Sequence, residues 1–288
     1  MTSSKTAAVT AESTSRFAQT DRYRIHYHDV GTGHPVVLLH GSGPGATGWS
    51  NFWPNIEYLA NDHRVIAVDM PGWGQSDTPN TTVGWDPVLD LVGLLDALEI
   101  EGAALVGNSM GGMTSIGTAV RFPERVSHAI TLGAPSPGAN LFSPGGVSEG
   151  MKVLLHATNE PSPESLKQLV QIMCYDQSMA TDELAELRYQ AAIANRDHLE
   201  SFFSMFTNPN VPPFIEYFQL GPRIADITAP SLFIHGRDDR VLSYEHSLRL
   251  VSTIANSRLV LLNRCGHWAQ IEHADEFNRI VADFVDHH

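Results

Sequence analysis

A serine between two glycines, in the stretch Gly107-Asn108-Ser109-Met110-Gly111, constrains the fold of this chain more than any other feature. An apolar run typical of a buried strand, residues 103–106, leads into it, and a helix-compatible stretch, residues 113–122, follows. A serine on such a sharp strand-to-helix turn is under backbone strain, and the turn closes only if the residues two before and two after it are small. The pattern therefore predicts a turn that lifts the Ser109 hydroxyl above a sheet and leaves the next backbone N–H free at the positive end of a helix.

Short apolar runs separated by helical patterns continue along the chain. The runs are of the buried parallel type, and they occur at residues 36–39, 65–68, 103–106, 129–132, 231–234 and 259–262. Asp86 followed by Pro87 is typical of a helix start, and a closing helical pattern covers about residues 273–285. Alternating residues around 23–30, followed by Gly31-Thr32-Gly33, predict an opening β-hairpin. The alternation of strands and helices predicts an α/β fold with a mostly parallel, doubly wound sheet.

The alternation breaks between about residues 135 and 222, where Pro and Gly border both ends. Inside this stretch, helical patterns cover residues 150–156, 163–173 and 182–194. We interpret residues 136–221 as a helical lid over the carboxyl ends of the strands, where α/β enzymes bind their ligands. Residues 21–135 and 222–288 then form the core. Residues 1–20, rich in Ser, Thr and Ala, are predicted to be a disordered tail.

The composition excludes several classes of function. A formal net charge of −14 gives the chain no electrostatic footprint for nucleic acid or for an anionic membrane. No apolar run approaches the ~20 residues of a membrane span, and the N-terminus has no apolar segment typical of a signal peptide. Cys174 and Cys265 form neither a disulfide framework nor a metal-binding pair. We therefore expect a cytoplasmic protein that acts on a small molecule without a metal or another cofactor.

Two loops after strands can supply the partners that Ser109 needs. A serine hydroxyl is a poor nucleophile at neutral pH, so it requires a base within hydrogen-bond reach and an acceptor on the base's other nitrogen. His267 follows the last apolar run and Asp239 follows the run before it, so both belong to the same edge of the sheet as Ser109. The chain order Ser, Asp, His is that of the α/β-hydrolases. Asp238 competes for the role of the acid, and we favour Asp239 because the acid usually stands third after the glycine.

An oxyanion hole requires two preorganised N–H donors. Met110, the residue after the nucleophile, supplies one of them. The glycine-rich loop His40-Gly41-Ser42-Gly43-Pro44-Gly45, after the first core strand, is expected to turn inward and present the N–H of Ser42 as the other. The loop is not typical of phosphate binding, because no Gly-Lys-Ser/Thr follows it.

Together these residues resemble the α/β-hydrolase superfamily and, more narrowly, the carbon–carbon bond hydrolases that cleave the meta-cleavage products of aromatic catabolism. The resemblance runs from about residue 20 to the end of the chain. The narrower match depends on the Ser-Gly-Pro-Gly-Ala loop, on Asn108 before the nucleophile and on Trp268 after the histidine. The motifs that carry it are His40-Gly41-Ser42-Gly43-Pro44-Gly45-Ala46, Gly107-Asn108-Ser109-Met110-Gly111-Gly112, Tyr175-Asp176-Gln177-Ser178, Gly236-Arg237-Asp238-Asp239-Arg240 and Cys265-Gly266-His267-Trp268-Ala269-Gln270.

The resemblance implies a substrate of the 2-hydroxy-6-oxo-hexa-2,4-dienoate type, cleaved at its C5–C6 bond to a 2-hydroxypenta-2,4-dienoate and a carboxylic acid. It also implies a homo-oligomer. Arg188 matches the position that binds the substrate carboxylate, for which a bidentate guanidinium is well suited. The other implied substrate contacts are polar at Asn51, Asn108 and Trp268, and apolar around the C6 group at Met151, Leu154, Met173 and Val241. Val241 is smaller than the residue that some relatives carry there, which leaves the size of the C6 subsite open.

Other functions could use the same residues. A carboxylesterase or lactonase would have the same triad and accept simple esters, but Arg188 together with Asn108 argues against it. A perhydrolase would not need a carboxylate-binding arginine. A low-turnover, ligand-binding relative is disfavoured by the intact triad and oxyanion loop. A serine nucleophile disfavours dehalogenases and epoxide hydrolases.

Overall fold

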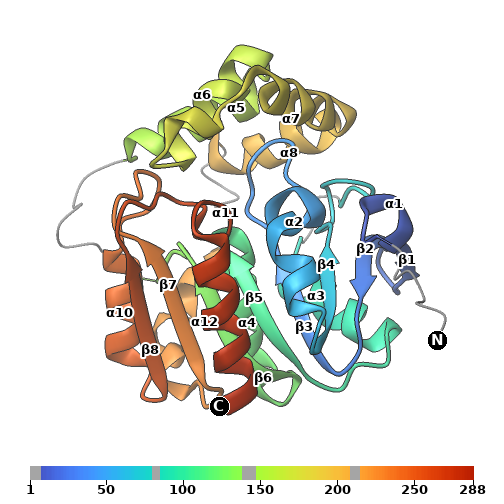
Figure 1. Ribbon diagram of the computed structural model, residues 1–288, viewed down its shortest axis with the longest axis vertical. Coiled ribbons are helices and arrows are strands. Elements are labelled where there is room, and N and C mark those ends of the chain that lie inside the picture. The colour runs from blue at the N-terminus through green and yellow to red at the C-terminus, as the bar shows by residue number, and fades with distance from the viewer. Residues whose placement is uncertain (1–7, 80–84, 138–146, 208–214) are drawn as a thin grey trace, which may run out of the picture.

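An eight-stranded sheet forms the centre of the computed structural model, which describes residues 8–79, 85–137, 147–207 and 215–288. Its strands are β1 (Ser15–Gln19), β2 (Arg24–Val30), β3 (His34–Leu39), β4 (His63–Val68), β5 (Ala103–Asn108), β6 (Val126–Leu132), β7 (Ser231–Gly236) and β8 (Ser257–Leu262). They lie in the order β1-β2-β4-β3-β5-β6-β7-β8 (Figure 1). The pairs β1–β2 and β2–β4 are antiparallel, and all the other pairs are parallel.

Helices cover both faces of the sheet. Those outside the long insertion are α1 (Ala11–Thr14), α2 (Gly48–Leu59), α3 (Pro87–Ala97), α4 (Met110–Arg121), α10 (Glu245–Thr253), α11 (Ala269–Glu272) and α12 (Ala274–His287). Side chains of α2 and α12 form one core with the sheet, and those of α3, α4 and α10 form the other. Successive residues of β3 alternate between the two cores, with Val36 and Leu38 on the α2 side and Val37 and Leu39 on the α4 side. The predicted doubly wound α/β fold is confirmed.

A layer of helices lies beyond the carboxyl ends of the strands, in the insertion between β6 and β7 (Figure 1). Its helices are α5 (Glu149–Asn159), α6 (Pro163–Met173), α7 (Asp182–Ala194), α8 (Arg196–Thr207) and α9 (Ile215–Gln219). The hydroxyls of Ser162 and Thr181 cap the first turns of α6 and α7, which coincide with the predicted helical patterns. The sequence patterns did not predict α8 or α9. Within the described ranges, no helix combines the length and apolar character that crossing a membrane requires.

Two predictions about the N-terminal region are wrong. Residues 11–19 are not disordered, because they form α1 and β1, and β1 pairs with β2 over its whole length. Backbone hydrogen bonds hold such an edge strand, so a polar composition does not reveal it. The opening hairpin turns at Thr20, whose N–H donates to the Tyr23 carbonyl at 2.9 Å, and not at residues 31–33. β2 and β3 do not pair, since β4 lies between them. Residues 1–7 of the predicted tail lie outside the described residues.

Candidate active site

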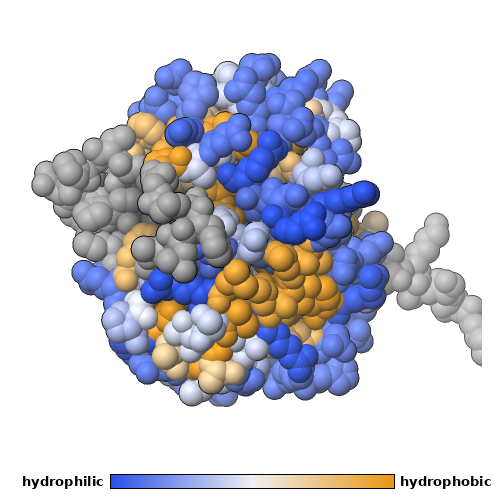
Figure 2. Space-filling model, turned by 90° about the vertical axis from the view of Figure 1, so that its left-hand side faces the viewer, coloured by the Kyte–Doolittle hydropathy of each residue, from blue (hydrophilic) through white to orange (hydrophobic). Residues whose placement is uncertain are grey.

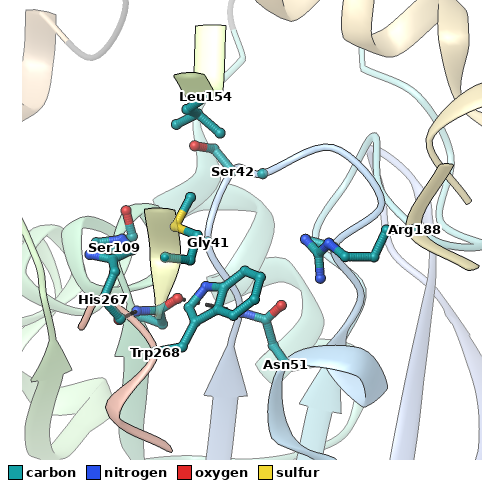
Figure 3. A pocket seen from close by; sticks show the side chains of 12 residues that line it. Gly41, Ser42, Asn51, Ser109, Leu154, Arg188, His267 and Trp268 are labelled. Atoms are coloured by element: carbon teal, nitrogen blue, oxygen red, sulfur yellow. Dashed lines mark hydrogen bonds between the residues drawn. The ribbon is translucent and has the colours of Figure 1, made fainter. Parts of the chain in front are cut away.

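Ser109 lies alone between β5 and α4, with φ 53° and ψ −114°. A positive φ is rare for a residue with a Cβ atom, and here the tight turn imposes it. A Cβ on Gly107 would collide with the backbone of Gly111, and a Cβ on Gly111 would collide with the carbonyl of Leu39. The packing of the turn therefore requires both glycines of the sequence pattern. Ser109 lines a pocket above the sheet (Figure 3).

An aspartate and a histidine come from the loops after β7 and β8. His267 Nδ1 lies 2.7 Å from Asp239 Oδ2, and both side chains are almost fully buried. The other carboxylate oxygen, Oδ1, accepts the N–H groups of Val241 and Leu242 at 2.7 and 3.0 Å. Burial raises the pKa of Asp239, but the charge of His267 and hydrogen bonds from His235 and His267 outweigh burial and bring the pKa well below its usual value. Asp239 is therefore ionised and orients the imidazole.

Ser109 and His267 lie together at one end of the pocket (Figure 3). The Ser109 N–H donates to the Leu132 carbonyl at 2.8 Å, and a Cβ on the next residue, Gly133, would lie 2.9 Å from His267 Nδ1. The serine hydroxyl and His267 Nε2 form no hydrogen bond in this structure; such contacts often tighten only when substrate binds. Asp238, the alternative acid, has a side chain that is 31% exposed and lies 3.9 Å from Arg237.

The empty space beside Ser109, including the part that is open to solvent, amounts to ≈ 290 Å³. The residues that line it are Gly41, Ser42, Gly43, Ala46, Asn51, Asn108, Ser109, Leu154, Met173, Arg188, His267 and Trp268. Its walls therefore come from the sheet loops and from α2, α5, α6 and α7 together. Met151 and Val241 do not line this pocket, and instead belong to the apolar cluster that also holds Leu154, Met173 and Trp268. The structure thus separates two of the four residues expected around the C6 group from the pocket itself.

The loop after β3 lies directly against the serine, since a Cβ on Gly41 would lie 3.3 Å from the Ser109 Cβ. His40 holds this loop: its Nδ1–H donates to the Gly41 carbonyl at 2.7 Å, and its Nε2 accepts the N–H of a residue after β4 at 3.0 Å. Burial lowers the pKa of His40, so the ring is neutral, as the acceptor role of Nε2 requires. Met110 is the first residue of α4, so no intrahelical carbonyl takes its N–H. Ser42 lines the same pocket.

Arg188 of α7 enters the pocket on the side opposite Ser109 (Figure 3). Its guanidinium carbon lies 4.8 Å from the centre of the Trp268 ring, and its Nη2 donates to the Pro44 carbonyl at 3.2 Å. Within the described residues its Nε has no hydrogen-bond partner and no carboxylate pairs with it. Burial lowers the pKa of Arg188 to about 10, so the side chain is still charged at neutral pH. A buried cation without a counter-ion is unfavourable, and an anion in the pocket would relieve it.

Two buried amides join the arginine side of the pocket to the catalytic side. Asn51 Nδ2 donates to Asn108 Oδ1 at 3.4 Å. Asn108 Nδ2 donates to the carbonyls of Leu132 and His267, both at 3.2 Å. Asn108, the residue before Ser109, therefore also holds the backbone of the loop that carries His267. All three predicted polar positions, Asn51, Asn108 and Trp268, line the pocket.

The loops after β7 and β8, which carry Asp239 and His267, are both bonded to the end of α6. The His267 N–H donates to the Met173 carbonyl at 2.7 Å. Glu272 accepts three backbone N–H groups, those of Tyr175 and Asp176 at 2.7 and 3.0 Å and that of Gly266 at 2.6 Å. The guanidinium of Arg240, next to Asp239, donates to the carbonyls of Gln171 and Cys174. We call residues 171–176 the clamped segment; sequence reasoning missed it because its bonds join distant parts of the chain.

We expect Glu272→Gln to lower both stability and turnover. The amide can accept hydrogen bonds at one atom only, so at least one backbone N–H faces an NH₂ group in the variant. The free energy of unfolding should therefore fall by about 2 kcal/mol. The melting temperature should fall by roughly 4 °C. Differential scanning calorimetry measures the shift, and Glu276→Gln, an exposed carboxylate of α12, is the matched control. Equal melting temperatures for the two variants would contradict the role given to Glu272.

Known proteins share this fold. The described residues include no group of three or more His, Cys, Asp or Glu side chains that could hold a metal ion. The model of the alpha/beta hydrolase family matches residues 36–280, and such a sheet, nucleophile turn and Asp–His pair define an α/β-hydrolase. The fold together with the match to the family model therefore shows that the chain is an α/β-hydrolase.

Curated relatives and solved structures narrow that class. A 2-hydroxy-6-oxononadienedioate/2-hydroxy-6-oxononatrienedioate hydrolase of Cupriavidus pinatubonensis is 45% identical, over 96% of this chain and 97% of its own. A 2-hydroxy-6-oxo-6-phenylhexa-2,4-dienoate hydrolase of Comamonas testosteroni is 41% identical, over 96% and 98%. The meta-cleavage product hydrolase CumD of Pseudomonas fluorescens IP01 superposes with a TM-score of 0.85 at 39% identity, over 94% and 97%. The chain belongs to the meta-cleavage product hydrolases of the α/β-hydrolase family and is an enzyme. The resemblance read from the sequence motifs is thereby confirmed.

Proposed function

We propose that this enzyme hydrolyses the C5–C6 bond of 2-hydroxy-6-oxo-hexa-2,4-dienoates. The products are a 2-hydroxypenta-2,4-dienoate and the carboxylic acid that carries the C6 substituent. The observation that carries the proposal is Arg188, a buried cation unpaired within the described residues, which faces Ser109 and His267 across one pocket. Such a site fits a substrate with a carboxylate at one end and a reactive carbonyl at the other. The dienoate substrates in the names of the relatives support the same assignment.

In the first stage the bound dienol becomes its keto tautomer. The substrate carboxylate pairs with Arg188, which places the chain of carbons along Trp268 and the two asparagines toward Ser109. The proton of the C2 hydroxyl leaves and a proton arrives at C5, with His267 as the base and acid within reach. C5 then becomes a CH₂ group between the C3–C4 double bond and the C6 carbonyl.

In the second stage Ser109 attacks C6 and gives its proton to His267, which Asp239 orients. The oxyanion binds the N–H groups of Ser42 and Met110. The C5–C6 bond breaks, and its electron pair delocalises through C3 and C4 to the oxygen on C2. That delocalisation makes carbon an acceptable leaving group. The departing dienolate takes up the proton that His267 holds and leaves as the 2-hydroxypenta-2,4-dienoate. His267, neutral again, then deprotonates a water, which hydrolyses the acyl-serine and releases the carboxylic acid.

A panel of substrates tests the proposed reaction. The loss of the yellow dienolate absorbance is followed for dienoates with hydrogen, alkyl or phenyl at C6, beside a nitrophenyl ester. We expect at least one dienoate to exceed the ester in kcat/KM by roughly a hundredfold or more, because only the dienoate offers a carboxylate to Arg188. Efficient ester hydrolysis with every dienoate untouched would identify a carboxylesterase or lactonase. Tight dienoate binding without turnover of either class would identify a ligand-binding relative.

We further propose that residues 136–221 act as the lid of this site and that the enzyme works in the cytoplasm. The lid is supported by Leu154, Met173 and Arg188, which reach the pocket from α5, α6 and α7. The location is supported by Cys174 and Cys265, which are both buried and free, as a reducing compartment favours.

We also propose a homo-oligomer that forms through β8. Within the described residues β8 is one edge of the sheet, and its Leu261 is 40% exposed. Leu248, on the neighbouring helix α10, is 39% exposed. Figure 2 shows an apolar area on the side of the molecule that carries these elements. An apolar edge strand with Arg258 as its charged residue is open to pairing, and two antiparallel copies would be self-complementary. Light scattering after gel filtration should give a multimer, and Leu261→Lys should give smaller species. A monomeric wild-type protein at micromolar concentration would contradict this proposal.

A further inference from the structure

A second histidine contacts the carboxylate of Asp239. His235, in β7, is fully buried, and its Nε2 lies 3.2 Å from Asp239 Oδ2. The same oxygen lies 2.7 Å from His267 Nδ1. The other oxygen, Oδ1, already accepts the backbone N–H groups of Val241 and Leu242. The aspartate thus stands between two imidazole rings that share one of its oxygens.

The surroundings of His235 determine which ring nitrogen carries the hydrogen. Nε2 also lies 2.9 Å from the Leu242 carbonyl, and carbonyl and carboxylate oxygens can only accept. Nε2 therefore carries a hydrogen, which it donates to the Leu242 carbonyl while it lies 3.2 Å from Asp239 Oδ2. Nδ1 lies 2.7 Å from the hydroxyl of Ser247, which donates to the ring when the ring is neutral. Ser247 is itself fully buried, so the ring is held in one orientation.

We propose that His235 is a positioning residue that acts on His267 through Asp239. Its Nε2–H withdraws negative charge from the oxygen that would otherwise stabilise protonated His267 more strongly. Loss of this donor would therefore strengthen the interaction of Asp239 with the imidazolium that His267 forms when it takes the proton of Ser109. The second donor also fixes the rotation of the carboxylate. His235 lies outside the residues that line the pocket, so it tunes the triad without touching substrate.

Other titratable groups lie near this pair. Burial lowers the pKa of His246, on α10, to about 4, so its ring is neutral at working pH. Burial raises the pKa of the Cys265 thiol well above its usual value, so it is uncharged. Asp238 and Glu245 are carboxylates close to the same groups. Within the described residues, the side chain of His267 hydrogen bonds to Asp239, and His235 lies 3.2 Å from the same carboxylate oxygen.

Three replacements of His235 separate its donor role from its packing role. Gln can place an amide N–H where Nε2 stands, Asn can reach only the Nδ1 position near Ser247, and Leu fills space without a donor. We measure kcat/KM from about pH 5 to about pH 9 with whichever of the dienoate and the ester turns over. For His235→Leu and His235→Asn the acid limb should move up by about one pH unit, the equivalent of one hydrogen bond to a charged group. His235→Gln should retain the wild-type profile.

The role of His235 rests on the proposed roles of Asp239 and His267. One further variant distinguishes a failure of the triad assignment from a failure of the role given to His235. If Asp239→Asn retains turnover, the triad assignment itself fails. If Asp239→Asn loses turnover but all three His235 variants keep the wild-type acid limb, only the role of His235 fails. An equal loss of kcat/KM at every pH would likewise reduce His235 to packing. Thermal unfolding of each variant checks that its fold is intact. Ser247→Ala removes the hydrogen-bond partner of His235 Nδ1, and it should move the acid limb less than His235→Leu does.

Discussion

Ser109→Ala should lower turnover of the dienoate by roughly 10³-fold to 10⁶-fold, the range seen when a serine nucleophile is removed. No other hydroxyl lines the catalytic end of the pocket except that of Ser42, which belongs to the oxyanion loop, so among the described residues nothing replaces the lost nucleophile. The proposed first stage needs no serine. The variant should therefore still bind the dienol through Arg188 and convert it to the keto form.

Stopped-flow absorbance tests both halves of this expectation. The dienolate band should shift on binding to Ser109→Ala and then persist, whereas in the wild type it disappears. Ser115→Ala is the matched control, because Ser115 is a buried serine of α4, the helix that follows Ser109; its hydroxyl donates to the Gly111 carbonyl, and it lies outside the pocket. Undiminished cleavage by Ser109→Ala would exclude the acyl-serine route.

Arg188→Met should lower kcat/KM for the dienoate by roughly 10²-fold to 10³-fold, because a buried charge pair with the substrate carboxylate is lost. Most of the change should fall on KM if the arginine mainly binds the carboxylate. Hydrolysis of a nitrophenyl ester, which has no carboxylate, should change little. A parallel loss with both substrates would mean that Arg188 supports the pocket rather than the substrate anion.

The same replacement should raise the melting temperature. Arg188 is 4% exposed and, within the described residues, lacks a counter-ion, so methionine of similar length removes an unfavourable buried charge. Arg196→Met is the matched control, since Arg196 is exposed on α8 and paired with Glu200. Opposite effects on stability and on dienoate turnover are what a binding site for an anion requires.

The parts of the site that could be predicted from the sequence are those with a local signature. Two glycines around Ser109 predict the turn. The carboxyl ends of parallel strands meet at one edge of the sheet, which predicts that Asp239 and His267 lie there together. The family resemblance supplied Arg188, whose pattern on an amphipathic helix would otherwise indicate a surface charge. The choice of Asp239 over Asp238 followed from a one-residue spacing, and the structure places Asp239 against the histidine.

The parts that could not be predicted depend on contacts between distant residues. His40 and Glu272 act through bonds to backbone atoms, which any residue would offer and which no pattern reveals. Met151 and Val241 are apolar like Leu154 and Met173, and only tertiary packing decides which of them face the pocket. β1 was missed because edge pairing needs no apolar sequence.

The clamped segment, residues 171–176, has a consequence for engineering substrate range. Its Met173 carbonyl accepts the N–H of His267, and its backbone hydrogen bonds to the side chains of Arg240 and Glu272. If the whole helical layer were replaced by that of a relative, the hydrogen bond between the Met173 carbonyl and the His267 N–H, which positions the imidazole, would change its geometry. Chimeras should therefore exchange α5, α7 and α8 while the recipient keeps its own residues 171–176. The substrate selectivity of the relative is then transferred, and the position of His267 is preserved.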